Sequence, residues 1–380
     1  MFPYVFKFEK RLETSHFSFL FVLVSSIVFA LLFGALLLLM AGANPIDAYW
    51  AMLKGSFGTS YNLSETLVRA TPLIFTGLSV TIAFRMRFWN IGAEGQLVIG
   101  GVAAVGTALF LTERLSLPES PWVWLPLMMI LSILAGAILG LIPALLKAFL
   151  DVNEIISTLM FNYIIIFWYQ YLYTTSWKDP QGFGFPGSAA IPDYTKLPRF
   201  SQRVHLGLVI AVIAAVIIWI ILSRTRLGYE IRLVGENPTA ARYAGVSIYR
   251  NIILVMLFSG GMAGLAGFSE IAGVSYRLQQ GLDVGNGFTG IIVAWLARLN
   301  PGGVILVAIL LSGLLVGSDA LQYTPGMQLP ASIGLVLQGA ILLFVLGADI
   351  FTRYRLRIIR HDQSPKSFPT PDSTHSQAGR

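Results

Sequence analysis

Long apolar stretches recur through this chain and restrict its fold more than any other feature. Residues 17–41, 125–149, 155–175 and 207–223 are each close to the roughly 20 residues that cross a bilayer as a helix. A membrane barrel would instead require alternating strands of about ten residues, and the sequence has no such pattern. The stretches therefore predict an all-α, polytopic transmembrane helix bundle.

The composition agrees with a membrane protein and excludes several kinds of function. The chain is 55% hydrophobic and 12% charged, whereas a soluble domain carries about a quarter charged residues. Its 37 glycines and 18 prolines allow helices to pack closely or to be interrupted. With no cysteine and no phosphate-loop, zinc-protease or nucleophile-elbow motif, we expect no metal, no cofactor and no enzymatic chemistry.

About ten membrane spans are predicted, followed by a C-terminal tail. The first stretch is interpreted as a retained helix, because no cleavage site separates it from a soluble domain. The stretch at 287–298 is short for a complete crossing and could be broken. The predicted spans lie near 17–41, 65–84, 92–112, 122–147, 155–175, 205–223, 251–272, 287–298, 302–318 and 331–349.

The distribution of basic residues predicts the topology. On the predicted inner side lie 18 of the 26 lysines and arginines, which favours cytoplasmic termini. Much of this excess borders spans, in 224–250 and 353–360, so nucleic-acid binding is not expected. We divide the chain into a cytoplasmic N-terminus (1–16), a membrane domain (17–350) and a basic tail (351–380) that we expect to be disordered. Segment 176–204 is assigned to the outer face, where a soluble partner could dock.

A carboxylate and two amides lie where two long apolar runs meet, in the string from Asn90 to Gln96. On a helix Asn90 and Glu94 share a face, and Gly92 and Gly95 allow close approach by a neighbour or a ligand. Polar groups at this depth must face protein or water. They either line a translocation path or form a buried network that locks two helices together, and both interpretations stay open.

A second polar stripe, Glu154, Thr158 and Asn162, steps by four along a predicted helix and therefore faces protein or water rather than lipid. Glu154 is better interpreted as a solvated carboxylate at the helix start, favoured by the macrodipole. Elsewhere, Glu65 and Arg69 are predicted to pair along one helix. Small residues around 260–267 predict a packing seam.

A short surface helix is predicted between two spans. Asn237 can cap it, Pro238 suits its first turn, and Gly245 lies where it would stop. Such a helix, at about 238–244, suits docking into a cleft of another protein, with a plain connecting helix as the alternative.

The strings at 90–96, 146–158 with Asn162, and 235–245 together resemble the permease subunits of sugar-type ABC importers, over about residues 20–358. Within the superfamily of branched-chain amino acid, ribose and nucleoside permeases, the string at 90–96 is most similar to permeases for purine nucleosides. The chain departs from the pattern at Trp89, where Phe is commoner, and at the bulky Trp295. Sugars and branched-chain amino acids are therefore kept as alternative cargo.

The resemblance implies a subunit in a bacterial-type plasma (inner) membrane that moves a small polar solute, a nucleoside before other cargo, by alternating access. It implies four partners: an ABC ATPase subunit that hydrolyses ATP, a second permease in a heterodimer, a solute-binding lipoprotein or periplasmic protein, and membrane lipid. ATPase coupling is implied for Gly235, Glu236, Asn237, Pro238, Ala241 and Gly245. Candidate substrate-path residues are Asn90, Glu94, Gln96, Thr158 and Asn162. The alternative from another class is an ion-coupled secondary transporter with Glu94 as the proton or cation carrier.

Overall fold

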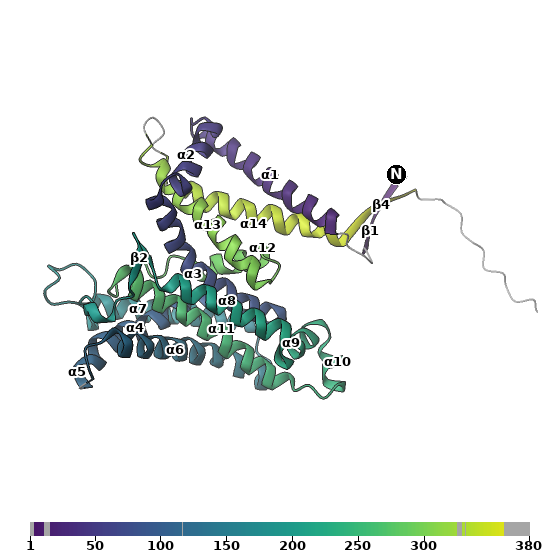
Figure 1. Cartoon of the computed structure of the whole chain (residues 1–380). Coiled ribbons are helices and arrows are strands. Elements are labelled where there is room, and N and C mark those ends of the chain that lie inside the picture. Colours follow the sequence, from purple (N-terminus) through teal and green to yellow (C-terminus); the bar gives the residue numbers. More distant parts are fainter. Residues whose placement is uncertain (1–3, 11–15, 116, 325–328, 331, 361–380) are drawn as a thin grey trace, which may run out of the picture. The chain divides into compact units, whose positions relative to one another are not determined.

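The computed structural model describes residues 4–10, 16–115, 117–324, 329–330 and 332–360, and most of them are helical (Figure 1). Three short π-helical turns, η1, η2 and η4, continue α4, α7 and α11. The elements in chain order are β1 (Tyr4–Lys10), α1 (His16–Met40), α2 (Pro45–Phe57), α3 (Ser60–Arg85), α4 (Ala93–Gly106), η1 (Thr107–Leu111), α5 (Thr112–Arg114), α6 (Pro121–Leu150), α7 (Glu154–Tyr171), η2 (Leu172–Ser176), η3 (Asp193–Thr195), β2 (Arg199–Ser201), β3 (Val204–His205), α8 (Gly207–Arg224), α9 (Arg226–Glu236), α10 (Pro238–Tyr243), α11 (Ile248–Glu270), η4 (Ile271–Ser275), α12 (Asn286–Leu296), α13 (Pro301–Leu321), α14 (Ser332–Arg353) and β4 (Tyr354–Arg360).

The chain divides into two compact units. The smaller combines residues 1–30 with 343–380, and its strands β1 and β4 pair antiparallel, with Tyr4 opposite Arg360 and Lys10 opposite Tyr354. The larger, residues 31–342, contains the helices that position the candidate site. Strand β4 lies in the tail for which the sequence predicted no regular element, and residues 361–380 lie outside the described residues.

Seven helices in the described part are long and apolar enough to cross a membrane: α3, α4 with η1, α6, α7 with η2, α8, α11 with η4, and α13. The apolar part of α1 and α2 form an eighth candidate as a pair bent by 111°, while α12 and residues 332–344 of α14 are shorter apolar helices. Every predicted span thus corresponds to a helix. The predicted all-α polytopic bundle is confirmed, although α12 is as short as its sequence indicated.

Three helices begin at the same dipeptide, an asparagine followed by a proline. Asn44, Asn237 and Asn300 start α2, α10 and α13, and each side-chain oxygen accepts a hydrogen bond from a backbone amide two or three residues later, at 3.0–3.1 Å. The proline occupies the first turn, where its missing N–H is not needed. This local signal explains why the chain turns sharply into a helix at these points.

The core of the larger unit contains a seam of glycines where α11 meets α4 and α6. Gly260 lies against the backbone of Gly136, and Gly264 lies against the carbonyl of Ser132, so that a Cβ at either position would overlap backbone atoms. Ser132 Oγ also donates to the Gly100 carbonyl at 2.9 Å. The predicted seam on α11 is confirmed, and it matches small residues on the partner helices that the sequence did not single out.

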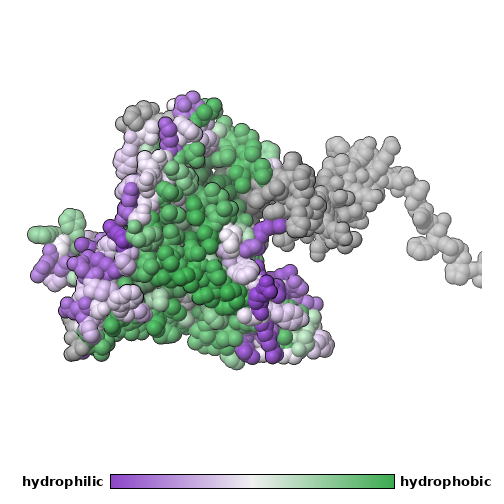
Figure 2. Space-filling view, in the orientation of Figure 1, coloured by the Kyte–Doolittle hydropathy of each residue, from purple (hydrophilic) through white to green (hydrophobic). Residues whose placement is uncertain are grey.

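The surface of the larger unit is apolar over the middle of its helices (Figure 2). Hydrophilic residues gather toward two ends, one around β2 and the other around α9 and α10 (Figures 1 and 2). Large exposed apolar side chains lie on several spans, including Ile164 and Phe167 on α7 and Leu306 and Leu310 on α13. Helices with apolar outer faces and hydrophilic ends fit a bilayer, so the chain is a multi-pass membrane protein.

Candidate functional site

A buried polar network joins the string at 90–96 to α11. The carboxamides of Asn90 and Gln96 pair with each other: Asn90 Nδ2 donates to Gln96 Oε1 at 2.9 Å, and Gln96 Nε2 donates to Asn90 Oδ1 at 3.2 Å. Asn90 Nδ2 also donates to Ser259 Oγ at 2.8 Å, and that hydroxyl donates to the Ser79 carbonyl. Both carboxamides are at most 1% exposed, so this network holds α3, α4 and α11 together.

The polar stripe of α7 contacts the same string from the other side. Asn162 Nδ2 donates to the Ile91 carbonyl and its Oδ1 accepts from the Gly95 amide, both at 2.8 Å. Thr158 Oγ1 accepts from the Ile91 amide at 3.3 Å. Thr158 and Asn162 are each 1% exposed. This part of the stripe therefore faces protein, one of the two surroundings that its spacing predicted.

Glu94 fixes the start of α12. Its two carboxylate oxygens accept hydrogen bonds from the amides of Gly285, at 2.8 Å, and Gly287. Glu94 is 1% exposed. Gly285 adopts φ +89°, a left-handed conformation that favours glycine. One buried carboxylate thus holds the turn that leads into α12.

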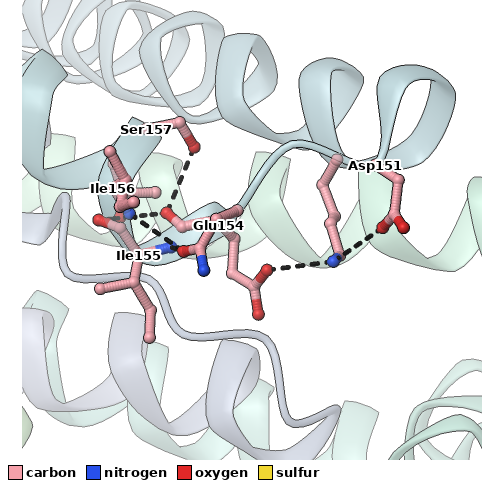
Figure 3. Close-up of polar contacts among 8 residues, drawn as sticks. Asp151, Glu154, Ile155, Ile156 and Ser157 are labelled. Carbon is pink, nitrogen blue, oxygen red and sulfur yellow. Dashed lines mark hydrogen bonds and ion pairs between the residues drawn. The ribbon is translucent and has the colours of Figure 1, made fainter.

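The beginning of α7 is stabilised by an ion-pair cluster and a cap (Figure 3). Lys147 Nζ lies 2.9 Å from Asp151 Oδ1 and 3.3 Å from Glu154 Oε2. Asn153 Oδ1 accepts from the amides of Ile155 and Ile156 at 2.9 and 3.2 Å. Because the Glu154 side chain is 16% exposed and paired, it is an ion-pair partner rather than the freely solvated carboxylate that the sequence indicated.

A cavity of about 480 Å³ lies between α3, α11, α12, α13 and α14 in the larger unit. This volume falls in the range of roughly 300–1,000 Å³ that is typical of small-molecule sites. Half of the lining residues are apolar or glycine and the other half are polar, so polar groups in this wall can orient a solute. The charged, hydroxyl and amide residues of the lining are Glu65, Arg69, Glu270, Asn286, Thr289, Ser318, Asp319 and Ser332.

Two ion pairs border this cavity, and they correct the predicted pairing of Glu65 with Arg69. Arg203 Nη1 donates to Glu65 Oε2 at 2.7 Å, and Arg69 Nη2 lies 2.7 Å from Asp319 Oδ2. The prediction was wrong because it considered a single helix. In the fold each side chain meets an opposite charge from another element, and neither needs its neighbour one turn away.

The five predicted path residues do not line this cavity. Glu94 contacts the cavity wall indirectly. It accepts hydrogen bonds from the amides of Gly285 and Gly287, and Asn286, which lies between them, is part of the lining. Thr76 Oγ1 supports the same residue by donating to the Asn286 carbonyl at 3.0 Å. The network around Asn90 and the cavity are thus connected through the start of α12.

The sequence reasoning missed two acids of the lining, Glu270 and Asp319, and Arg203, which pairs with the lining residue Glu65. Glu270 lies inside the apolar stretch 251–272 and Asp319 directly follows the stretch 302–318. A carboxylate in such a position is a functional candidate by default, and this signal could have found both. Arg203 lies in a polar segment, where a charge is unremarkable.

The β2–β3 hairpin carries Arg203 to the cavity, and His205 anchors the hairpin. His205 is 1% exposed, accepts from the Gly207 amide at Nδ1 and packs against Gly273. Burial, reinforced by the positive charges of Arg199 and Arg203, lowers the pKa of His205 to about 4. The imidazole is therefore neutral at pH 7 and acts as a packed anchor.

At the opposite end, α9 and α10 form a helical elbow at Asn237. The predicted surface helix is confirmed as α10, while α9 was not predicted. Ala241 is fully buried and Tyr243 is 91% exposed, so α10 has one attached side and one free side. Gly245 ends the elbow with φ +77°.

The elbow is held to the bundle on two sides. Gly235 packs so closely on the Arg85 carbonyl at the end of α3 that a Cβ would overlap it. Asn251 Nδ2 of α11 donates to Glu230 Oε2 at 3.0 Å. This hydrogen bond, with added attraction from Arg226, lowers the pKa of Glu230 below its usual range. Movement of α9 and α10 would therefore be transmitted to α3 and α11.

Comparison with known proteins gives a consistent assignment. Residues 62–346 match the family described as "Branched-chain amino acid transport system / permease component". The guanosine ABC transporter permease protein NupP of Bacillus subtilis is 38% identical over 86% of this chain and 93% of its own length. The glucose ABC transporter permease protein TsgB13 of Haloferax volcanii is 35% identical (88% and 89%), and the nucleoside ABC transporter permease protein NupB of Lactococcus lactis is 33% identical (84% and 88%).

Proposed function

Because this chain belongs to the family of permease components of branched-chain amino acid transport systems, we propose that it is the permease subunit of an ATP-driven importer of nucleosides. Similarity to guanosine and nucleoside permeases over most of the chain supports this cargo. The similar glucose permease keeps a simple sugar as the alternative cargo. A branched-chain amino acid, which the family description names, is favoured by none of these three relatives.

The proposed mechanism is alternating access driven by a separate ABC ATPase. The cavity between α3, α11, α12 and α13 holds the solute, and the elbow receives the movement of the ATPase. A solute-binding lipoprotein or periplasmic protein delivers cargo at the end that carries β2, and a second permease completes a heterodimer. The membrane is a bacterial-type plasma membrane with both termini in the cytoplasm, as the excess of basic residues on the α10 side supports.

The observation that carries this proposal is the elbow at Asn237. A short helix stands free on one side, its start is fixed by a cap, and its base is packed on the ends of two spans. A connecting loop would need none of these features. Gly235, Glu236, Asn237, Pro238, Ala241 and Gly245 are therefore proposed to couple ATP hydrolysis to transport, with the exposed side of α10 as the contact surface.

An ion-coupled transporter with Glu94 as the carrier is less favoured. Both oxygens of Glu94 are engaged by backbone amides, and a carrier must exchange its ion with an aqueous path. We instead propose that Asn90, Glu94, Gln96, Thr158 and Asn162 contribute to the path by holding the string at 90–96 and the start of α12 in place.

Replacing Tyr243 by alanine is expected to uncouple the importer. Exposed tyrosines are frequent anchors of protein interfaces, so nucleoside uptake into proteoliposomes should fall at least about tenfold while ATP hydrolysis persists. The complete complex with its ATPase and receptor is measured with ATP inside and without an ion gradient. Tyr163→Ala is the control, because Tyr163 is 50% exposed in the middle of α7 and lies at neither end of the bundle; it should transport normally.

Two outcomes of this experiment would contradict the proposal. Unchanged uptake by Tyr243→Ala would remove α10 from the coupling surface. Wild-type uptake that requires an ion gradient and ignores ATP would decide for a secondary transporter.

A further inference from the structure

The cavity contains one carboxylate without a direct partner. Glu270, the last residue of α11, is partly buried, and its side-chain oxygens make no hydrogen bond or ion pair with any residue that the structure describes. The other two acids of the lining differ, because Glu65 is bound by Arg203 and Asp319 by Arg69. Glu270 is therefore the acid of this cavity that is left to bind a solute.

Two arginines lie near this carboxyl group. Arg69 and Arg203 attract it and Glu65 repels it, but both arginines are already engaged by their own partners. The two oxygens of a carboxylate accept hydrogen bonds and provide about four lone-pair sites. Because an unsatisfied polar group within a helix bundle is costly, the solute that fits best brings hydrogen-bond donors to both oxygens.

On a neutral nucleoside, the 2′- and 3′-hydroxyls of the ribose are two adjacent O–H donors that match the two oxygens of one carboxylate. Acidic side chains recognise ribose hydroxyls in this way in dinucleotide-binding folds. The apolar part of the lining, including Val68, Pro72 and Val274, offers the base a surface without competing polar groups. The ribose is also common to all ribonucleosides, whereas the hydrogen-bonding edge of the base is not.

We propose that Glu270 binds the vicinal 2′,3′-hydroxyls of a ribonucleoside in the cavity between α3, α11, α12, α13 and α14. This inference rests on the proposed nucleoside import and adds the residue and the part of the cargo that it recognises. Both hydrogen bonds to this one carboxyl group would be lost together, so their loss should have a large effect on ribonucleosides alone.

The test compares guanosine with 2′,3′-dideoxyguanosine in the complete importer. The receptor is the same in every variant, so any change in the ratio of the two uptake rates reports the permease. Glu270→Ala should reduce guanosine uptake about tenfold or more and change dideoxyguanosine uptake less than about twofold. Glu270→Gln, which keeps one acceptor oxygen, should give an intermediate ratio. Glu119→Ala, at an exposed carboxylate between α5 and α6, should keep the wild-type ratio.

Each other outcome overturns the inference. An equal loss of both nucleosides would mean that Glu270 supports the fold or binds a cation, and a ratio that changes between guanosine and adenosine instead would place it at the base. If Glu270→Ala fails to assemble, a wild-type ratio in assembled Glu270→Gln is decisive against the proposal. A wild-type importer that takes up glucose and no nucleoside would overturn the proposed cargo first, whereas nucleoside uptake with unaltered ratios would overturn the ribose contact alone.

Discussion

Replacing Gly264 by leucine is expected to remove nearly all folded protein from the membrane. A Cβ at this position would overlap the Ser132 carbonyl and approach Gly136, and backbone atoms cannot rotate away as a side chain can. Overpacking of a core ordinarily costs about 1–3 kcal/mol, and here two helices must also separate. Since proteins are stable by only about 5–15 kcal/mol, the yield of monodisperse protein after detergent extraction should fall at least about tenfold.

Gly339→Leu is the matched control for this experiment. Gly339 is also helical, on α14, but no atom lies within 4 Å of the Cβ that would be added there. Its yield and its melting temperature should stay close to those of the wild type. Normal accumulation of Gly264→Leu would show that α11 and α6 are not packed backbone to backbone.

Replacing Glu94 by alanine is expected to destabilise the protein by about 2–6 kcal/mol, since each of two buried amides that loses its acceptor costs about 1–3 kcal/mol. The amides are those of Gly285 and Gly287, so the turn before α12 should loosen. The lining residue Asn286 lies between them, and nucleoside uptake should fall further than the amount of folded protein does. Thermal unfolding in detergent and uptake in proteoliposomes measure the two effects.

Glu94→Gln separates charge from hydrogen bonding. The amide keeps an acceptor for one of the two backbone groups, so about half of the stability should return if the role is to hold the turn. A Glu94→Ala protein that melts with the wild type would disprove this role. A Gln variant that is as stable as the wild type yet inactive would revive the interpretation of Glu94 as an ion carrier.

The spans could be predicted from sequence because the signal is local. An apolar stretch of about 20 residues has few alternatives to a membrane helix, and an Asn-Pro dipeptide both caps and starts a helix. Helix α2 was missed although Asn44 and Pro45 carry the same start signal, because its residues do not form a long apolar stretch. It carries the charged residues Asp47 and Lys54. One side of α2 packs on α13, where Ser56 Oγ donates to the Gly313 carbonyl. No feature within residues 45–57 indicates that this helix packs on α13.

The candidate site was predictable only in part. The string at 90–96 was correctly expected to be polar within the bundle, and the sequence left open whether it formed a path or a network. Deciding this requires the positions of Ser259, Asn162 and Gly287, which approach from three other helices. The partner of Glu65 was predicted wrongly because the true partner is remote: Glu65 meets Arg203, which is 138 positions away, whereas helical spacing compares neighbours.

The glycine seam also bears on how the bundle can move. An interface of backbone on backbone contains few rotatable bonds that could absorb sliding, so α4, α6 and α11 should travel together as one rigid body. Glu270 belongs to this block, whereas Asp319 belongs to α13. Opening of the cavity would then move α13 away from a carboxyl group that stays in place. Since the chain has no cysteine, paired labels can test this: spacings from α4 to α6 should stay constant during turnover, while those from α4 to α13 change.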